Sequence, residues 1–365
     1  MTYLRRTMLR TAVLTSAFLV MPTPRAFAGA PRAIASAEFT QAAEHAVELM
    51  KAVKQLRLER GYPINLELDP TGSGLIGAAD TALTSMRGNL VSKRSSANPN
   101  FAAAVVSMLK QAGVKEGDTI AVGWTGSLPA FNLCVAASIE TLDLNPVCVA
   151  STSASQYGAN FPEMTWLDIE RYLHEKELIS FRSVAASLGG REDQGLNFND
   201  KSRNMLRAAI ERNQLPFLHE TTLGDSIRRR MDLIDRHADD HEIKAYINVG
   251  GGAASVGRSI GKRSYHPGLN LEASAKALSI DSVMTRFMKR GVPVIHMVSA
   301  SKLAVNYDFP VPPAAIPAVG EGKLFASSTS RIASARKPVG KQVSKVIETP
   351  APAPEEVDVV APSVP

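Results

Sequence analysis

The stretch of sequence that most constrains the fold covers residues 119–150. It reads as a strand from Thr119, a tight turn from Gly123 to Ser127, a helix closed by Asn145 and Pro146, and a second strand over Pro146–Ala150. Apolar residues recur at helical spacing within the helix. A strand–helix–strand unit of this kind belongs to an open, largely parallel sheet, where ligands bind at the carboxyl ends of the strands. The turn after the first strand is therefore the predicted place for function.

The rest of the chain extends this pattern into one α/β fold. We expect an open, largely parallel, Rossmann-like sheet with helices on both faces. Its N-terminal half covers residues 29–178 and its C-terminal half covers residues 179–309. We also expect a short strand at 64–68 and a basic, mobile loop at 261–268. The arginines at positions 228–230 are expected on the solvated surface of a helix.

The chain begins with what reads as an export signal, residues 1–28. It has a cationic start, an apolar uncharged stretch at 11–21 and a small-x-small cleavage pattern that ends at Ala28. The paired Arg5 and Arg6 loosely resemble a twin-arginine signal. We expect an exported protein, in the periplasm or on the outer face of the cytoplasmic membrane. An uncleaved N-terminal anchor, giving peripheral membrane association, is the alternative.

Charge argues against nucleic acid as a partner. The formal net charge is +6, and the first 28 residues hold four arginines and no acid, so the remainder carries only +2. From residue 310 to 365 proline, alanine and serine dominate, and the end is acidic. This composition predicts a disordered tail, which suits binding to a wall polymer or a partner.

No cofactor or metal is expected from the sequence. The dinucleotide fingerprint GxGxxG is not met at Gly123 or at the glycine run 250–252. Cys134 and Cys148 fall in the helix and second strand of the first unit and are expected as buried thiols, with a disulfide as the alternative. No cluster of metal ligands stands out.

Candidate ligand-binding residues lie in glycine- and hydroxyl-rich loops and in a basic pair just ahead of a predicted helix at 101. Such loops can turn successive backbone amides toward an anion. The candidates are Thr71, Gly72, Ser73, Lys93, Arg94, Gly126, Ser127, Ser155, Asn160, Gly250, Gly251 and Gly252. Other interpretations stay open: a flexible connection for the loop at 69–77, a solvated pair for the two cations, and close backbone packing for the glycine run.

Three residues are candidates for catalysis. Ser127 is a candidate nucleophile, although its turn is not the G-x-S-x-G elbow, and His266 or His296 would have to serve as its base. His266 is itself a catalytic candidate. Asp168 is a candidate general base, but Thr165 and Asp168 have the spacing of a helix capping box. We also expect the Ser127 hydroxyl to cap the helix that follows it.

Several motifs together resemble the poly-gamma-glutamate system protein family. They are DPTGSGLIG at 69–77, KRSSANPNFAA at 93–103, GWTGSLPA at 123–130, SQYGAN at 155–160, TWLD at 165–168 and NVGGG at 248–252. The resemblance covers roughly residues 38–305. It implies an accessory role in the synthesis or export of poly-gamma-glutamate, a capsule or cell-surface polymer, and it carries over no catalytic residues.

Two functions follow as hypotheses. In the first, the protein is a non-enzymatic accessory factor that binds the anionic polymer, the membrane-bound synthase complex, or both, at a strand-end cleft. In the second, it is a gamma-glutamyl amide hydrolase or transferase with Ser127 as nucleophile. A histidine or carboxylate beside Ser127 would favour the enzyme, whereas only amides and basic side chains there would favour the binding protein.

Overall fold

A seven-stranded sheet forms the centre of the protein, in the order β6-β5-β2-β1-β7-β9-β8. All neighbouring strands run parallel except β8, which pairs antiparallel with β9. The bounds of these strands are β1 Thr119–Thr125, β2 Asn145–Ser151, β5 Ala185–Ser187, β6 Phe217–Leu218, β7 Ile243–Val249, β8 Gly268–Asn270 and β9 Val294–Met297. The computed structural model describes residues 30–326, with side chains from residue 37 onward. The predicted α/β class with a mostly parallel sheet is confirmed.

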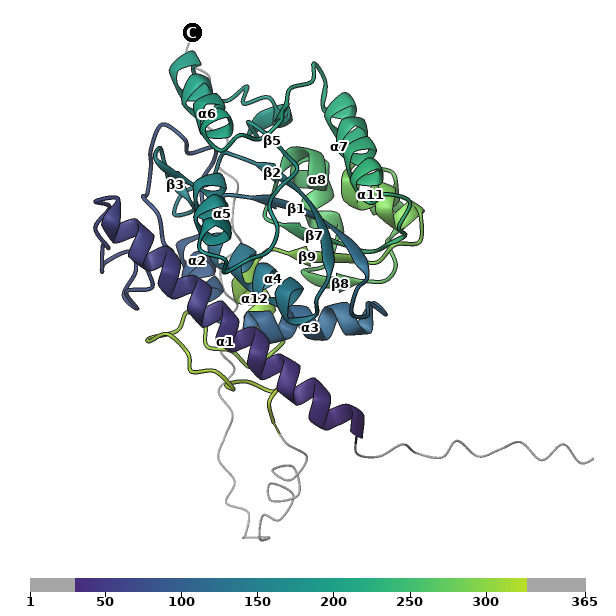
Figure 1. Ribbon diagram of the computed structural model, residues 1–365. Coiled ribbons are helices and arrows are strands. Elements are labelled where there is room, and N and C mark those ends of the chain that lie inside the picture. Colours follow the sequence, from purple (N-terminus) through teal and green to yellow (C-terminus); the bar gives the residue numbers. More distant parts are fainter. Residues whose placement is uncertain (1–29, 327–365) are drawn as a thin grey trace, which may run out of the picture. The chain divides into compact units, whose positions relative to one another are not determined.

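Helices cover both faces of the sheet, as Figure 1 shows. One face packs against α1 Ala30–Glu59, α3 Phe101–Gln111, α4 Pro129–Thr141, α5 Trp166–Glu175, α6 Asp200–Arg212 and α12 Ala300–Val305. The other face packs against α7 Leu223–His237, α8 Ala253–Val256 and α11 Val283–Lys289. Shorter elements complete the described chain: α2 Leu90–Ser96, β3 Asn160–Phe161, β4 Met164–Thr165, η1 Arg191–Asp193, α9 Arg258–Ser264 and α10 Ala275–Leu278.

The alternation of side chains along a strand divides the core into two layers. In β1, Ile120, Val122 and Trp124 belong to the core under α1, whereas Ala121 belongs to the core under α7. Each strand residue must face one helical layer or the other, because successive side chains point to opposite faces. All seven residues of β1 are buried, as expected for a central strand covered on both faces.

Several local predictions are wrong. Residues 64–68 form a loop with a hydrogen-bonded turn and no strand. Half of the predicted mobile loop at 261–268 lies in α9, where the backbone N–H of Gly261 bonds the carbonyl of Gly257. Lys93 and Arg94 come before the helix that begins at residue 101, as expected, but they lie within a separate short helix, α2, which is capped by the Asn89 side chain.

Strands from both predicted halves pair within the one sheet, with β1 between β2 and β7. Composition assigns residues 310–326 to the tail, but part of this segment contacts the core. The Asn100 side chain donates to the carbonyl of Ala318 and accepts from the N–H of Gly320. The predicted signal at 1–28 and the rest of the predicted tail lie outside the described residues.

Candidate functional site at the sheet switch point

The chain reverses its direction of travel across the sheet between β1 and β7. From β1, the strands β2, β5 and β6 follow on one side, and β7 and β9 follow on the other. At such a switch point the loops that leave the two strands diverge, and ligands of open α/β sheets bind in the crevice between them. The loop after β1 contains Ser127, and the loop after β7 contains Gly250–Gly252.

Lys93 reaches this place from α2. Its ammonium donates to the backbone carbonyl of Ser127 and to the hydroxyl oxygen of Ser155, which is 2.8 Å away. The side chain is almost fully buried, with 4% of the residue exposed. Burial, and then the nearby positive charge of Lys262, lower the pKa of Lys93 from 10.5 to about 7. Near neutral pH the buried Lys93 amine therefore populates both its charged and its neutral form.

Lys262 is the second lysine of the site and comes from α9. A Cβ built on Gly251 would lie 3.6 Å from its Nζ atom, which places the ammonium against the loop after β7. Burial, and then the charge of Arg263, lower its pKa. Across residues 37–326, neither Lys93 nor Lys262 forms an ion pair with a carboxylate. The two cations therefore share a site without an anion from the surrounding chain.

Ser127 and Ser155 join the loops that follow β1 and β2. The backbone N–H of Ser155 donates to Oγ of Ser127 at 3.0 Å, and the N–H of Ser127 donates to Oγ1 of Thr125 at 3.1 Å. The predicted role of Ser127 as a helix cap is wrong, because α4 begins after Leu128 without a side-chain cap. Its hydroxyl instead holds the 155 loop beside Lys93. We call the following residues the switch-point site: Lys93, Thr125, Ser127, Ser155, Gly251 and Lys262.

Close packing explains most of the glycines around this site. A Cβ on Gly250, where φ is +91°, would lie 2.4 Å from Oγ1 of Thr125, and one on Gly252 would lie 3.1 Å from Cγ2 of the same residue. A Cβ on Gly158 would lie 2.5 Å from the carbonyl oxygen of Gly126. Such approaches leave no room for a side chain. Of the two interpretations of the glycine run, the contacts favour backbone packing, so the charged side chains carry the argument for binding.

The glycine-rich loop at 69–77 is closed on its own acid. The Asp69 carboxylate accepts from Thr71 Oγ1 and from both the N–H and Oγ of Ser73, at 3.0–3.1 Å. It also accepts from the N–H of Gly74 at 2.7 Å. Gly72 donates its N–H to the Asp69 carbonyl. The structure therefore does not bring Thr71, Gly72 and Ser73 into the switch-point site, because their donors are already bonded to the carboxylate or the carbonyl of Asp69.

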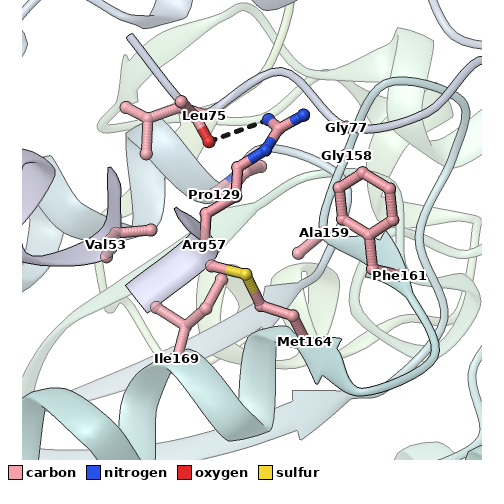
Figure 2. Close-up of a pocket in the computed structure, with 11 residues that line it drawn as sticks. Val53, Arg57, Leu75, Gly77, Pro129, Gly158, Ala159, Phe161, Met164 and Ile169 are labelled. Carbon is pink, nitrogen blue, oxygen red and sulfur yellow. Dashed lines mark hydrogen bonds between the residues drawn. The ribbon is translucent and has the colours of Figure 1, made fainter. Parts of the chain in front are cut away.

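Arg57 fixes the same loop to α1, beside a small cavity that Figure 2 shows. The guanidinium donates to the carbonyls of Gly74 at 3.0 Å and Ile76 at 2.6 Å and lies over the ring of Phe161. Burial lowers its pKa. Apart from this arginine the cavity lining is largely apolar. Gly158 and Ala159 form part of its wall, but none of the residues Lys93, Ser127 and Ser155 lines it.

Two other ligand-binding candidates also have structural partners. Arg94 donates to the backbone carbonyls of Glu67 and Leu68, which anchors that loop to α2. The Asn160 side chain is fully buried and bonds the N–H and carbonyl of Ala78 and the hydroxyl of Thr84. Neither side chain has a hydrogen bond to a residue of the switch-point site. Of the predicted candidates, the structure brings together Lys93, Gly126, Ser127, Ser155 and Gly250–Gly252.

Asp168 is a capping residue. It accepts from the N–H and hydroxyl of Thr165, both at 2.7 Å, and forms a capping box at the start of α5. Its remaining capacity is taken by Arg212 and Asn213. The hydrogen bonds from Arg212 lead the contacts that lower its pKa despite burial. A carboxylate held in this way by four partner groups is unsuited to accept a proton as a general base.

Neither candidate histidine serves Ser127. His296 is fully buried in β9, where Nδ1 accepts from the Asn248 amide at 2.9 Å and Nε2 donates to the Lys262 carbonyl at 3.2 Å. Burial lowers its pKa to about 4, so the ring is neutral. His266 is exposed before β8 and has no hydrogen bond to Ser127 within the described chain. The groups that contact Ser127 are instead an amide and a lysine.

The sequence analysis missed a second buried cation at the same edge of the sheet. Arg230 was expected on a solvated helix surface, but it is only 2% exposed and forms an ion pair with Asp193 at 3.0 Å. Hydroxyl groups from β2, β5 and α7 complete the cluster. We call the following residues the Arg230 cluster: Ser151, Ser187, Asp193, Ser226 and Arg230. The sequence marks this cluster only by three serines at predicted strand or helix ends, and that pattern is not specific for a buried ion pair.

No cofactor or metal arrangement emerges from the residues described. Between residues 37 and 326, no group of three or more His, Cys, Asp and Glu side chains could hold a metal ion. Cys134 and Cys148 are free and buried, as predicted, and burial raises the pKa of both thiols. No helix in the described part of the chain is long and apolar enough to cross a membrane.

Comparisons with known proteins found no relative of this chain. No model of a known protein family, no curated protein and no solved structure matches the chain.

Proposed function

We propose that this protein is an exported accessory protein of poly-gamma-glutamate synthesis or export, and that the switch-point site binds carboxylates of the polymer. One observation carries the proposal: the buried Lys93 and the half-buried Lys262 face the same strand-end site without a carboxylate partner from residues 37–326. Burying an amine without a counterion costs stability, and an anionic ligand removes that cost.

The chemistry of the polymer suits this site. Poly-gamma-glutamate presents a carboxylate on every repeat, and a lysine ammonium donates charge-assisted hydrogen bonds to such groups. An incoming carboxylate would favour the protonated form of Lys93, whose pKa of about 7 leaves much of it neutral in the free protein. Binding of the polymer therefore couples to uptake of a proton at neutral and mildly alkaline pH.

The surroundings of Ser127 favour binding over the predicted hydrolase with Ser127 as nucleophile. Oγ of Ser127 already accepts the N–H of Ser155, and the charged group bonded to Ser127 is the Lys93 ammonium, which donates to its carbonyl. No histidine or carboxylate hydrogen-bonds to Ser127 within residues 37–326. A serine nucleophile needs such a base within hydrogen-bond reach.

The test is retention on immobilised poly-gamma-glutamate. The wild-type protein should be retained at low ionic strength and released by salt. Lys93→Met and Lys262→Met should each weaken retention, whereas Lys201→Met, a change of an exposed lysine on α6, should leave it unchanged. Equal retention of all four proteins would refute the site, and no retention of the wild type would refute the ligand.

A further inference from the structure

We propose that Ser155 and Lys93 form a nucleophile–base pair that transfers acyl groups from amide or ester substrates. This assigns the nucleophile to Ser155, which the sequence analysis treated only as a ligand-binding residue. The substrate class, a gamma-linked glutamyl amide, rests on the proposed function. The pairing itself rests on the contact between the two side chains.

The contact has the geometry that general-base catalysis requires. Nζ of Lys93 lies 2.8 Å from Oγ of Ser155, within the range for direct proton transfer. In its charged form Lys93 donates to this oxygen, and in its neutral form its lone pair can accept the Ser155 proton. The second hydrogen bond, to the Ser127 carbonyl, uses one N–H and fixes the direction of the amine.

The environment keeps Lys93 able to act as a base. Its pKa of about 7 means that a large fraction of the amine is neutral at physiological pH, as serine–lysine chemistry demands. Ser155 is itself positioned, because its N–H is fixed by Oγ of Ser127 at 3.0 Å. Ser127 is therefore a positioning residue for the pair.

The reaction balances with water as the only co-reactant. Oγ of Ser155 attacks the amide carbonyl carbon while its proton passes to Lys93. The C–N bond then breaks, and the leaving amine takes that proton, which leaves an acyl ester on Ser155. Water attacks the ester carbonyl and gives its proton to Lys93, which returns it to Ser155 Oγ as the acid departs. A second amine in place of water gives transfer instead of hydrolysis.

The test is covalent labelling of the full-length protein with diisopropyl fluorophosphate, followed by peptide mapping. Oγ of Ser155 should bond phosphorus and release fluoride, and the labelling rate should rise with pH through about 7 as Lys93 loses its proton. Ser155→Ala should abolish the label. Lys93→Met should slow labelling by about 100-fold or more, within the range for general-base catalysis. Ser153→Ala, a buried serine on the same loop, should label like wild type.

Label on another residue, no label, or an unchanged rate in folded Lys93→Met would each overturn the pair. Mapping of the wild-type protein decides the site even if Ser155→Ala fails to fold. Retention on poly-gamma-glutamate separates the two proposals. A protein that is retained but not labelled would overturn the acyl transfer alone, whereas one labelled at Ser155 but not retained would support the pair and overturn only the substrate class.

Discussion

Two buried cations at one edge of the sheet have opposite surroundings. Arg230 pairs with Asp193 and bonds the hydroxyls of Ser151 and Ser187, so its charge is neutralised by the chain. Within residues 37–326, the Lys93 ammonium hydrogen-bonds only to a carbonyl and a hydroxyl, and the charge that lowers its pKa is that of another lysine, Lys262. The first arrangement suits a structural role. The second leaves a buried amine without a counterion. An anionic ligand can supply that counterion, and we therefore place the functional site at Lys93.

Loss of Arg230 should have the largest effect on stability. Arg230→Met leaves the Asp193 carboxylate buried at 4% exposure without its cation. Removing one partner of a buried ion pair costs about 3–5 kcal/mol, so the free energy of unfolding in urea should fall by that amount. The double variant Arg230→Met with Asp193→Leu should recover much of the loss. A loss below about 1 kcal/mol would mean that the Arg230 cluster does not have the stabilising role proposed for it.

Lys93→Met should act in the opposite direction and stabilise the free protein. The folded pKa of Lys93, about 7, lies below its ordinary 10.5, so the unfolded chain binds more protons between these values and wild-type stability rises with pH across that window. The methionine avoids the cost of burying the charge, so its advantage should be largest at pH 7 and below, about 5 kcal/mol, and should shrink toward pH 10.

Urea unfolding at pH 6, 7.5 and 9 measures this advantage. The same variant should lose polymer retention, which would separate stability from function at one residue. A Lys93→Met protein less stable than wild type at pH 6 would contradict the interpretation of Lys93 as an uncompensated charge.

Glu170 is a buried acid that forms no ion pair with the described side chains, so it is the acidic counterpart of Lys93. Its Oε1 accepts from the N–H and hydroxyl of Ser183, whereas Oε2 has no partner there. Burial raises its pKa from 4.5 to about 7, so the folded protein keeps a proton that the unfolded chain loses, and wild-type stability falls as pH rises through this window.

Glu170→Gln keeps the Ser183 contacts but cannot ionise. Its stability should decline less between pH 4.5 and 7, by about 2 kcal/mol, in thermal or urea unfolding. Parallel pH profiles for the variant and the wild type would show that the carboxyl already ionises freely in the fold.

Lys262→Met should have the smallest effect of the four. It removes the positive neighbour that lowers the pKa of Lys93, so that pKa should rise and polymer binding should persist to higher pH. Overall retention should weaken by about tenfold at low salt, since one charge-assisted contact is lost. Retention measured from pH 6 to 9 tests both parts, and an unshifted pH profile would place Lys262 away from Lys93.

The sequence predicted the elements whose signals are local. The strand at 243–249 and the strand–helix–strand unit from 119 follow from apolar periodicity, and the cap at Asp168 follows from its spacing to Thr165. The convergence of Ser127, Ser155 and the glycine run follows from the rule that parallel strands end at one edge.

What the sequence could not predict depends on distant partners. Lys93 lies in a polar seven-residue helix, and the groups that bury and bond it are 34 and 62 residues away. Arg230 pairs with an acid 37 residues away. The loop at 69–77 has the composition of an anion site, but Asp69 supplies its own anion from within the motif.

The most direct test of the account is calorimetric titration with a short poly-gamma-glutamate at pH 7.5, in two buffers that differ in ionisation enthalpy. We predict binding accompanied by proton uptake, because a bound carboxylate shifts Lys93 to its charged form. Both the uptake and most of the affinity should disappear in Lys93→Met. Binding with no proton uptake, or with the same uptake in Lys93→Met, would contradict the claim that Lys93 takes up a proton and binds the carboxylate of the ligand.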